Sequence, residues 1–237
     1  MIRKEKFVPG QYYHIYSRII LNTPEFSDKS NAERLALNFW IANSTKSDEV
    51  FRYLQNLRNR KDISQEKMLE ILERGKKIVD VLCYVIMSDH YHLLLKERRG
   101  NGIHNFIHKC NTSVAKYINI KNDRHGPLFE SRFKSKHVDT NEYLLHLSLY
   151  IHLNPLDFLG GKEWREHGVK NWESAKAKLL NYPWSSLKAF LTENYKDPIL
   201  SGTKIIKQQI GSGKDYEDFL REWSEDQFDK VSDLIIN

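Results

Sequence analysis

Residues 81–96 constrain the fold more than any other part of this sequence. They form two apolar runs separated by Ser88-Asp89, and the second run begins with His90-Tyr91-His92. This pattern predicts two adjacent strands joined by a tight turn. Because successive side chains of a strand point to opposite faces, the two histidines share one face. Two neighbouring imidazoles are either half of a metal site or polar residues of a half-exposed strand, and the pair alone does not decide between these.

Turn residues and apolar spacing indicate the other elements. Aromatic and β-branched residues after Pro9-Gly10 predict a first strand at 11–21, in which His14 is interpreted as a packed strand histidine. Helical spacing predicts two or three helices over 26–60 and 63–78, with Ser27 or Ser30 as a cap, and another helix at 103–118. A strand is expected at 128–138. A further helix should begin after Thr140 and end at Asn154, since a residue before proline is disfavoured in helical geometry.

The order of these elements predicts the fold class. Strand, helices, strand, strand, helix, strand, helix is the order of a ferredoxin-like split β-α-β antiparallel sheet, so we expect an α+β protein with helices on one face of the sheet. After Leu159-Gly-Gly161 the chain becomes rich in tryptophan and helical spacing, which predicts a helical C-terminal appendage.

Composition narrows the class of protein. No run approaches the eighteen apolar residues of a membrane span, and the first residues lack the apolar segment of a signal peptide, so we expect a cytoplasmic protein without membrane attachment. Cys83 and Cys110 are far apart and lie in predicted regular elements, which argues against disulfides and zinc fingers.

Positive charge is concentrated in one segment. The whole chain carries a formal charge of +6, and the segment from Lys96 to His137 holds ten lysines and arginines against three acids, so the remainder is close to neutral. Such a segment is either a solvated basic face or a surface that binds a polyanion beside the histidine pair.

Four separated motifs carry a resemblance to a known family. In order and spacing the chain resembles the REP-associated tyrosine transposases, which belong to the HUH single-strand nucleases. The motifs are Met87-Ser-Asp-His-Tyr-His-Leu-Leu-Leu95, Gly126-Pro-Leu-Phe129 with Arg132-Phe-Lys134, Tyr143-Leu-Leu145 with Tyr150-Ile-His-Leu-Asn-Pro155, and Tyr182-Pro-Trp-Ser-Ser186.

The resemblance implies a site and a reaction. His90 and His92 would bind Mg²⁺ or Mn²⁺ with Asn154 as a third ligand, and Tyr150 would be the nucleophile. The implied reaction is nicking and rejoining of single-stranded or hairpin DNA through a 5′-phosphotyrosine. The change in composition after Pro155 predicts a catalytic domain over residues 1–158 and a helical extension over 159–237. Interleaved aromatic and basic residues suit single-stranded DNA, and the expected DNA contacts are Arg98, Arg99, Lys109, Lys116, Arg124, Arg132, Lys134 and Lys136.

Two other functions remain open at this level. A catalytically silent DNA- or RNA-binding protein of the same fold would keep the basic segment without needing the phenol. A metal hydrolase unrelated to DNA would keep the histidines without needing the charge. The sequence also leaves open whether the protein is a monomer or a homodimer.

Overall fold

A four-stranded antiparallel sheet lies at the centre of the computed structural model, which describes residues 6–56, 65–211 and 213–226. The strands lie side by side in the order β2-β3-β1-β4, with every neighbouring pair antiparallel. This is the order expected for a split β-α-β sheet. Their bounds are Tyr12–Arg18 for β1, Val79–Ile86 for β2, His90–Glu97 for β3 and Lys134–Val138 for β4. The predicted α+β class with an antiparallel sheet is therefore confirmed.

Helices surround the sheet. In chain order they are α1 (Lys29–Ala42), α2 (Ser47–Asn56), α3 (Gln65–Glu73), α4 (Gly102–Lys121), α5 (Asn141–Leu153), α6 (Leu156–Leu159), α7 (Trp164–His167), α8 (Trp172–Asn181), α9 (Lys188–Leu191), α10 (Lys204–Ile210) and α11 (Gly213–Asp226), with short 3₁₀ turns at Ile20–Asn22 and Glu25–Ser27. No helix within the described residues is long and apolar enough to cross a membrane. The predicted helical residues at 57–60 and 63–64, and the predicted extension from 227 onward, lie outside the described residues.

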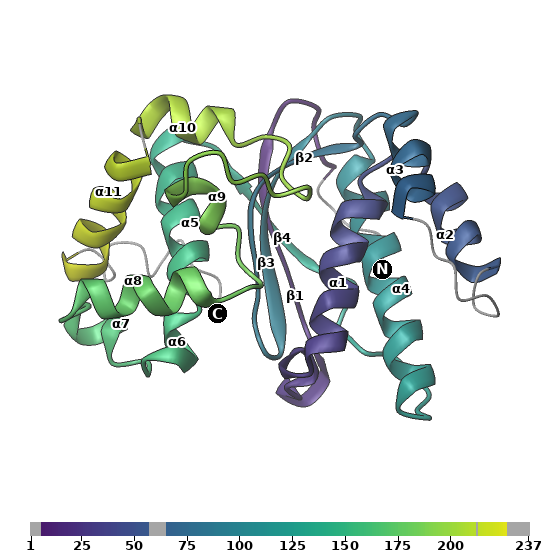
Figure 1. Cartoon of the computed structure of the whole chain (residues 1–237), viewed down its shortest axis with the longest axis horizontal. Helices are drawn as coiled ribbons and strands as arrows, with labels where there is room; N and C mark the ends of the chain where they lie inside the picture. Colours follow the sequence, from purple (N-terminus) through teal and green to yellow (C-terminus); the bar gives the residue numbers. More distant parts are fainter. Residues whose placement is uncertain (1–5, 57–64, 212, 227–237) are drawn as a thin grey trace.

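Helices cover both faces of the sheet, not one as predicted. Helices α1 and α4 pack on one face, and α5 with the helices after it packs on the other (Figure 1). The reason is that side chains of β3 are buried on both of its faces. Tyr91 and Leu93 enter the core shared with α1 and α4, whereas Leu94 enters the core shared with α5. A strand buried on both faces shows a continuous apolar run instead of alternation, which is the pattern of residues 81–87.

Local chemistry fixes where the main helices begin and end. Asp28, not Ser27 or Ser30, caps α1, and its carboxylate accepts from the Ser30 and Asn31 N–H groups. Glu97 is fully buried, and its carboxylate accepts N–H hydrogen bonds from the loop and the first turn of α4, including Gly102 at 3.0 Å and Ile103 at 2.9 Å. A buried carboxylate therefore satisfies the free N–H groups at this helix start.

The fourth strand and the fifth helix differ in detail from the sequence prediction. Strand β4 begins at Lys134, so the predicted residues 128–133 precede it, and only Phe129 makes a bridge there, to Ile19. Helix α5 ends at Leu153, one residue before the predicted end at Asn154, yet Asn154 keeps helical angles, φ −47° and ψ −41°. The chain consequently passes through Pro155 directly into α6, because packing against the helices that follow outweighs the preference of a residue before proline.

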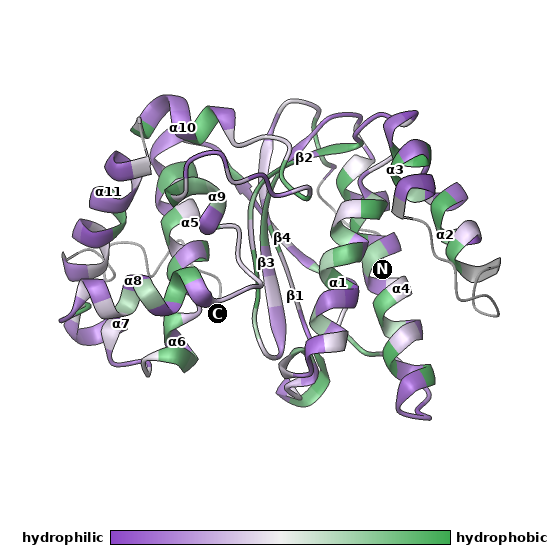
Figure 2. Ribbon diagram, viewed as in Figure 1, coloured by the Kyte–Doolittle hydropathy of each residue, from purple (hydrophilic) through white to green (hydrophobic). Residues whose placement is uncertain are grey.

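The C-terminal helices share a core with the sheet face that carries α5. Trp172, Leu220 and Trp223 are buried in the same cluster as Leu82 and Leu94 of the sheet. In Figure 2 the outer helix α11 is coloured mostly hydrophilic, as expected for a helix with one face in solvent. The segment before α9 also hydrogen-bonds to the free edge of β2, where the Ile86 N–H donates to the Trp184 carbonyl at 2.9 Å.

Candidate functional site

The two histidines of the motif lie at the start of β3 on the face covered by α5. The centroids of the His90 and His92 rings are 5.0 Å apart. Strand pairing sets Arg18 of β1 opposite His90 and Tyr16 opposite His92. The pair thus sits in the middle of the sheet and not at an exposed edge, with a second strand supplying side chains beside it.

His14 of β1 contacts His92 directly. Its Nε2 is 2.9 Å from Nδ1 of His92, and both side chains are buried. Burial lowers the pKa of His14 to about 3 and lowers the pKa of His92 well below 6.5, with the neighbouring histidines and arginines adding to the shift on His92. Both rings are therefore neutral near pH 7. The interpretation of His14 as a packed strand histidine is correct as to burial but missed this hydrogen bond.

His90 is held in the same way by a different group. Its Nδ1 is 2.6 Å from Oδ1 of Asp89, and the Arg18 guanidinium is 3.9 Å from the other carboxylate oxygen. Burial alone would raise the pKa of Asp89, but the hydrogen bond and charge of His90, with the charge of Arg18, lower it overall. Each of the two motif histidines thus has Nδ1 engaged by a supporting group, which leaves Nε2 as the nitrogen open to a ligand.

Tyr150 of α5 lies across from His92. The two ring centroids are 5.6 Å apart and the rings meet edge to face. The Thr140 hydroxyl caps α5 by accepting the Tyr143 N–H at 3.0 Å, and the apolar face of the helix packs on β2 and β3. Tyr150 is therefore only 5% exposed and its position is fixed by the packing of the whole helix. The phenol and the imidazoles come together within a single chain.

Arg165 is a member of this cluster that the sequence analysis missed. Its guanidinium lies 5.5 Å from the centroid of the Tyr150 ring, and its Nη2 is 3.5 Å from Oδ1 of Asn154. Two hydrogen bonds of 2.7 Å to the Asp157 carboxylate hold it there. Arg165 lies on α7, beyond the predicted catalytic domain, and no motif flags it. It reaches the phenol because α6 and α7 follow α5 along the chain and the neighbouring Trp164 is buried in the same core cluster as Tyr150.

Asn154 closes α5 and points its amide at protein groups. Its Nδ2 donates to the Tyr150 carbonyl oxygen at 3.0 Å, and its Oδ1 faces Arg165. The side chain is 2% exposed. To bind a cation, Oδ1 of Asn154 would have to give up its 3.5 Å contact with Arg165. Its role as a third ligand stays a prediction.

The predicted DNA-binding residues fall into separate groups. Lys134 and Lys136 of β4 lie beside the site, because their ammonium groups are over the rings of Tyr16 at 5.5 Å and Tyr143 at 5.4 Å. The others are elsewhere. Arg98 and Arg99 follow the far end of β3, Lys109 and Lys116 lie on α4 across the sheet, and Arg124 and Arg132 lie in the loop between α4 and β4. Arg98, Lys109 and Arg124 are paired with Asp80, Asp48 and Glu25, respectively.

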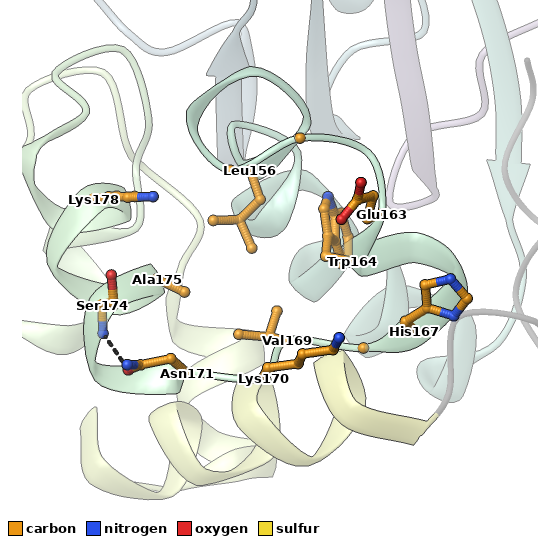
Figure 3. Close-up of a pocket in the computed structure, with 13 residues that line it drawn as sticks. Leu156, Glu163, Trp164, His167, Val169, Lys170, Asn171, Ser174, Ala175 and Lys178 are labelled. Atoms are coloured by element: carbon orange, nitrogen blue, oxygen red, sulfur yellow. Dashed lines mark hydrogen bonds between the residues drawn. The ribbon is translucent and has the colours of Figure 1, made fainter.

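A separate cavity of about 230 Å³ lies among the C-terminal helices (Figure 3). Figure 3 shows Leu156, Trp164 and Val169 around it, with Lys170 and Lys178 also in its lining. Its lining includes neither the motif histidines nor Tyr150. The cavity is therefore not the space in which the imidazoles and the phenol meet.

The donor set at the imidazoles suits a divalent cation. Metal-binding histidines are usually oriented by a hydrogen bond at the second ring nitrogen, and here His14 and Asp89 supply that bond. The described residues hold no group of three or more histidine, cysteine, aspartate or glutamate side chains arranged for a metal. A cation at this place would thus need an amide oxygen, substrate oxygens or water to complete its ligands, as Mg²⁺ and Mn²⁺ accept.

Comparison with known proteins finds a family match over part of the chain. Residues 50–154 match the family described as IS200-like transposases, a range that includes the motif histidines, Tyr150 and Asn154. This match confirms the resemblance to the transposases inferred from the motifs. A structure of a REP-associated tyrosine transposase bound to a REP hairpin is similar over 85% of this chain and 92% of that one, with 11% identity and a TM-score of 0.49. No curated protein matches the sequence.

Proposed function

We propose that the protein nicks and rejoins single-stranded DNA beside a hairpin, because residues 50–154 match the family of IS200-like transposases. The observation that carries the proposal is the contact between Tyr150 and His92, whose ring centroids are 5.6 Å apart. Transfer of a DNA strand requires the nucleophile and the cation ligands to lie close together, because the nucleophile and the cation act on the same phosphate.

Tyr150 is the nucleophile in this proposal. Its oxygen attacks the phosphorus as the bond to the 3′ oxygen breaks, so the DNA is left with a 3′-hydroxyl and a 5′-phosphotyrosine. The phenol loses its proton and the departing oxygen gains one. Attack of a 3′-hydroxyl on the phosphotyrosine reverses the step and joins a strand. The enzyme needs no nucleotide cofactor, because the covalent bond conserves the energy of the phosphodiester.

His90 and His92 would hold the cation through their Nε2 atoms, with Asn154 as the third protein ligand. When bound, Mg²⁺ or Mn²⁺ supplies Lewis-acid polarisation of the phosphate oxygens. The surrounding residues orient the two imidazoles and keep His92 neutral. His14 and Asp89 orient the two rings by their hydrogen bonds of 2.9 and 2.6 Å, and the buried position of His92 keeps it neutral.

Arg165 stabilises negative charge that develops during the reaction. Its guanidinium lies 5.5 Å from the centroid of the Tyr150 ring, so it can contact a phosphate that approaches the ring. The two hydrogen bonds to Asp157 fix the direction of the guanidinium.

Lys134 and Lys136 supply the DNA contacts nearest to the reaction. They belong to the edge strand β4 and lie on the same side of the sheet as Tyr16 and Tyr143. A strand that runs along this edge would meet two cations, which suits a phosphate backbone.

Trapping of the covalent intermediate tests the function. End-labelled hairpin DNA with unpaired flanks is incubated with the protein and Mg²⁺ or Mn²⁺, and protein-linked DNA is resolved on denaturing gels. We expect linkage that is lost in Tyr150→Phe and kept in Tyr143→Phe, a matched change on the same helix. Linkage that survives in Tyr150→Phe would refute the assignment of the nucleophile. DNA binding without linkage under both metals would favour a catalytically silent DNA-binding protein.

A further inference from the structure

The turn after β1 presents an apolar side chain to solvent in a strained conformation. Leu21 is 86% exposed, the most exposed large hydrophobic residue in the part of the chain that the structure describes. Its backbone has φ 57° and ψ 22°, and the next residue, Asn22, has φ 53°. Left-handed angles are costly for a leucine and easy for glycine or asparagine. A leucine at this position therefore does not stabilise the fold.

The turn is anchored on both sides. The Ile19 N–H donates to the Asp89 carbonyl at 2.8 Å, and the Ile20 N–H donates to the Leu128 carbonyl at 3.0 Å. Further along, the Phe26 N–H donates to the Ser88 carbonyl at 2.8 Å. These bonds attach the turn to the loop that precedes the motif histidines and to the loop between α4 and β4. Leu21 is consequently carried on a fixed support and not on a free loop.

A chain of polar contacts joins the turn to the candidate metal ligands. Arg18 donates to Oδ1 of Asn22 at 3.2 Å and lies 3.9 Å from the Asp89 carboxylate, which in turn contacts His90. Arg18 is also the residue of β1 opposite His90. A DNA strand whose phosphate lies over the imidazoles would therefore have its neighbouring nucleotides within reach of this turn.

We propose that Leu21 is a wedge that packs against a nucleobase of the single-stranded DNA next to the scissile phosphate. The inference rests on the proposed function and adds a contact outside the family match, which begins at residue 50. Apolar side chains that insert beside bases unstack them and hold a distorted strand, and leucine is among the residues used for this. The support would keep the base displaced while the phosphate is held.

The surroundings favour a nucleobase over a protein partner. A protein interface needs an apolar patch, whereas Leu21 is followed by the exposed polar residues Asn22 and Thr23 and lies close to the half-exposed cation of Arg18. One apolar side chain beside a cation matches the alternation of base and phosphate along a single strand.

Fluorescence of 2-aminopurine tests the wedge. The base is placed at each of the first unpaired positions beside a DNA hairpin, and binding is measured with Leu21→Gly, Leu21→Met and the unaltered protein. Glycine suits the left-handed backbone, so Leu21→Gly should fold at least as stably as the unaltered protein, which a melting curve checks. We expect it to lose the fluorescence change at one position and to bind the flanked hairpin about tenfold more weakly, as loss of one buried leucine contact predicts. Leu21→Met should keep both.

Controls separate this inference from the proposed function. Leu69→Ala removes another exposed leucine, on α3, and should change nothing. A blunt hairpin should bind equally to the unaltered protein and to Leu21→Gly. If the unaltered protein links DNA through Tyr150 while Leu21→Gly binds flanked hairpins and changes their fluorescence normally, the wedge is refuted and the function stands. If the unaltered protein does not bind flanked hairpins at all, both are refuted.

Discussion

His152 offers a quantitative test of how the nucleophile helix is held in place. It lies on α5 two residues after Tyr150, is fully buried, and contacts the Tyr216 hydroxyl at 2.7 Å and the Ser186 hydroxyl at 2.8 Å. These bonds tie α5 to α11 and to the segment that borders β2. Burial lowers its pKa from 6.5 to about 3.

The direction of the pH dependence follows from that lowered pKa. The folded protein requires the neutral ring, whereas the unfolded chain binds a proton with a pKa near 6.5. The contribution of His152 to stability is therefore fully present above pH 6.5 and is lost as the pH falls from 6.5 toward 3. Each pH unit in this interval costs up to about 1.4 kcal/mol, so the loss between pH 7 and pH 5 is about 2 kcal/mol.

Replacement of His152 by Gln isolates this effect. Urea unfolding of both proteins is measured at pH 7, 6 and 5, and the difference in unfolding free energy is plotted against pH. At pH 7 the variant should be less stable by about 2 kcal/mol, since two buried hydrogen bonds are disturbed. That gap should close by about 2 kcal/mol at pH 5. The contributions of His14 and His92 are present in both proteins and cancel in the difference. A gap that is the same at pH 7 and pH 5 would refute the reasoning.

Two further predictions concern the site. His14→Phe removes the hydrogen-bond partner of His92 Nδ1. It should weaken Mn²⁺ binding about 10- to 100-fold in a calorimetric titration, as loss of a supporting group at a metal ligand does. Unchanged affinity would mean that this hydrogen bond does not orient a ligand. Arg165→Met should lower the rate of covalent linkage about 100-fold and change hairpin affinity little, because the guanidinium acts on the charge that develops in the reaction. An equal loss of rate and affinity would make Arg165 a DNA contact only.

The sequence predicts much of the sheet because its signals are local. The apolar runs around Ser88-Asp89 give the hairpin, and the spacing of residues 103–118 gives α4. The helix that carries Tyr150 is marked by Thr140 at its start. These patterns depend on neighbours a few residues apart, so a single sequence displays them.

Contacts between distant segments are not displayed in this way. The hydrogen bond from His14 to His92 depends on the register of β1 against β3, which no local pattern fixes. Arg165 reaches Tyr150 only because Asn154 stays helical and leads the chain into α6 and α7. The continuous apolar run of residues 81–87 is the local sign that both faces of the sheet are covered, but it does not show which helices form the second layer.

The segment that borders β2 has a consequence for any shortened form of this protein. Trp184 and Ser186 occupy the hydrogen-bonding groups of Ile86 and Tyr84, and Ser201 does the same for Val81. A fragment cut at residue 158 would keep both motif histidines and Tyr150 but would leave this edge strand with unpaired N–H and C=O groups. Such an edge recruits strands from other molecules, so we expect that fragment to self-associate. A soluble truncation has to extend past Gly202.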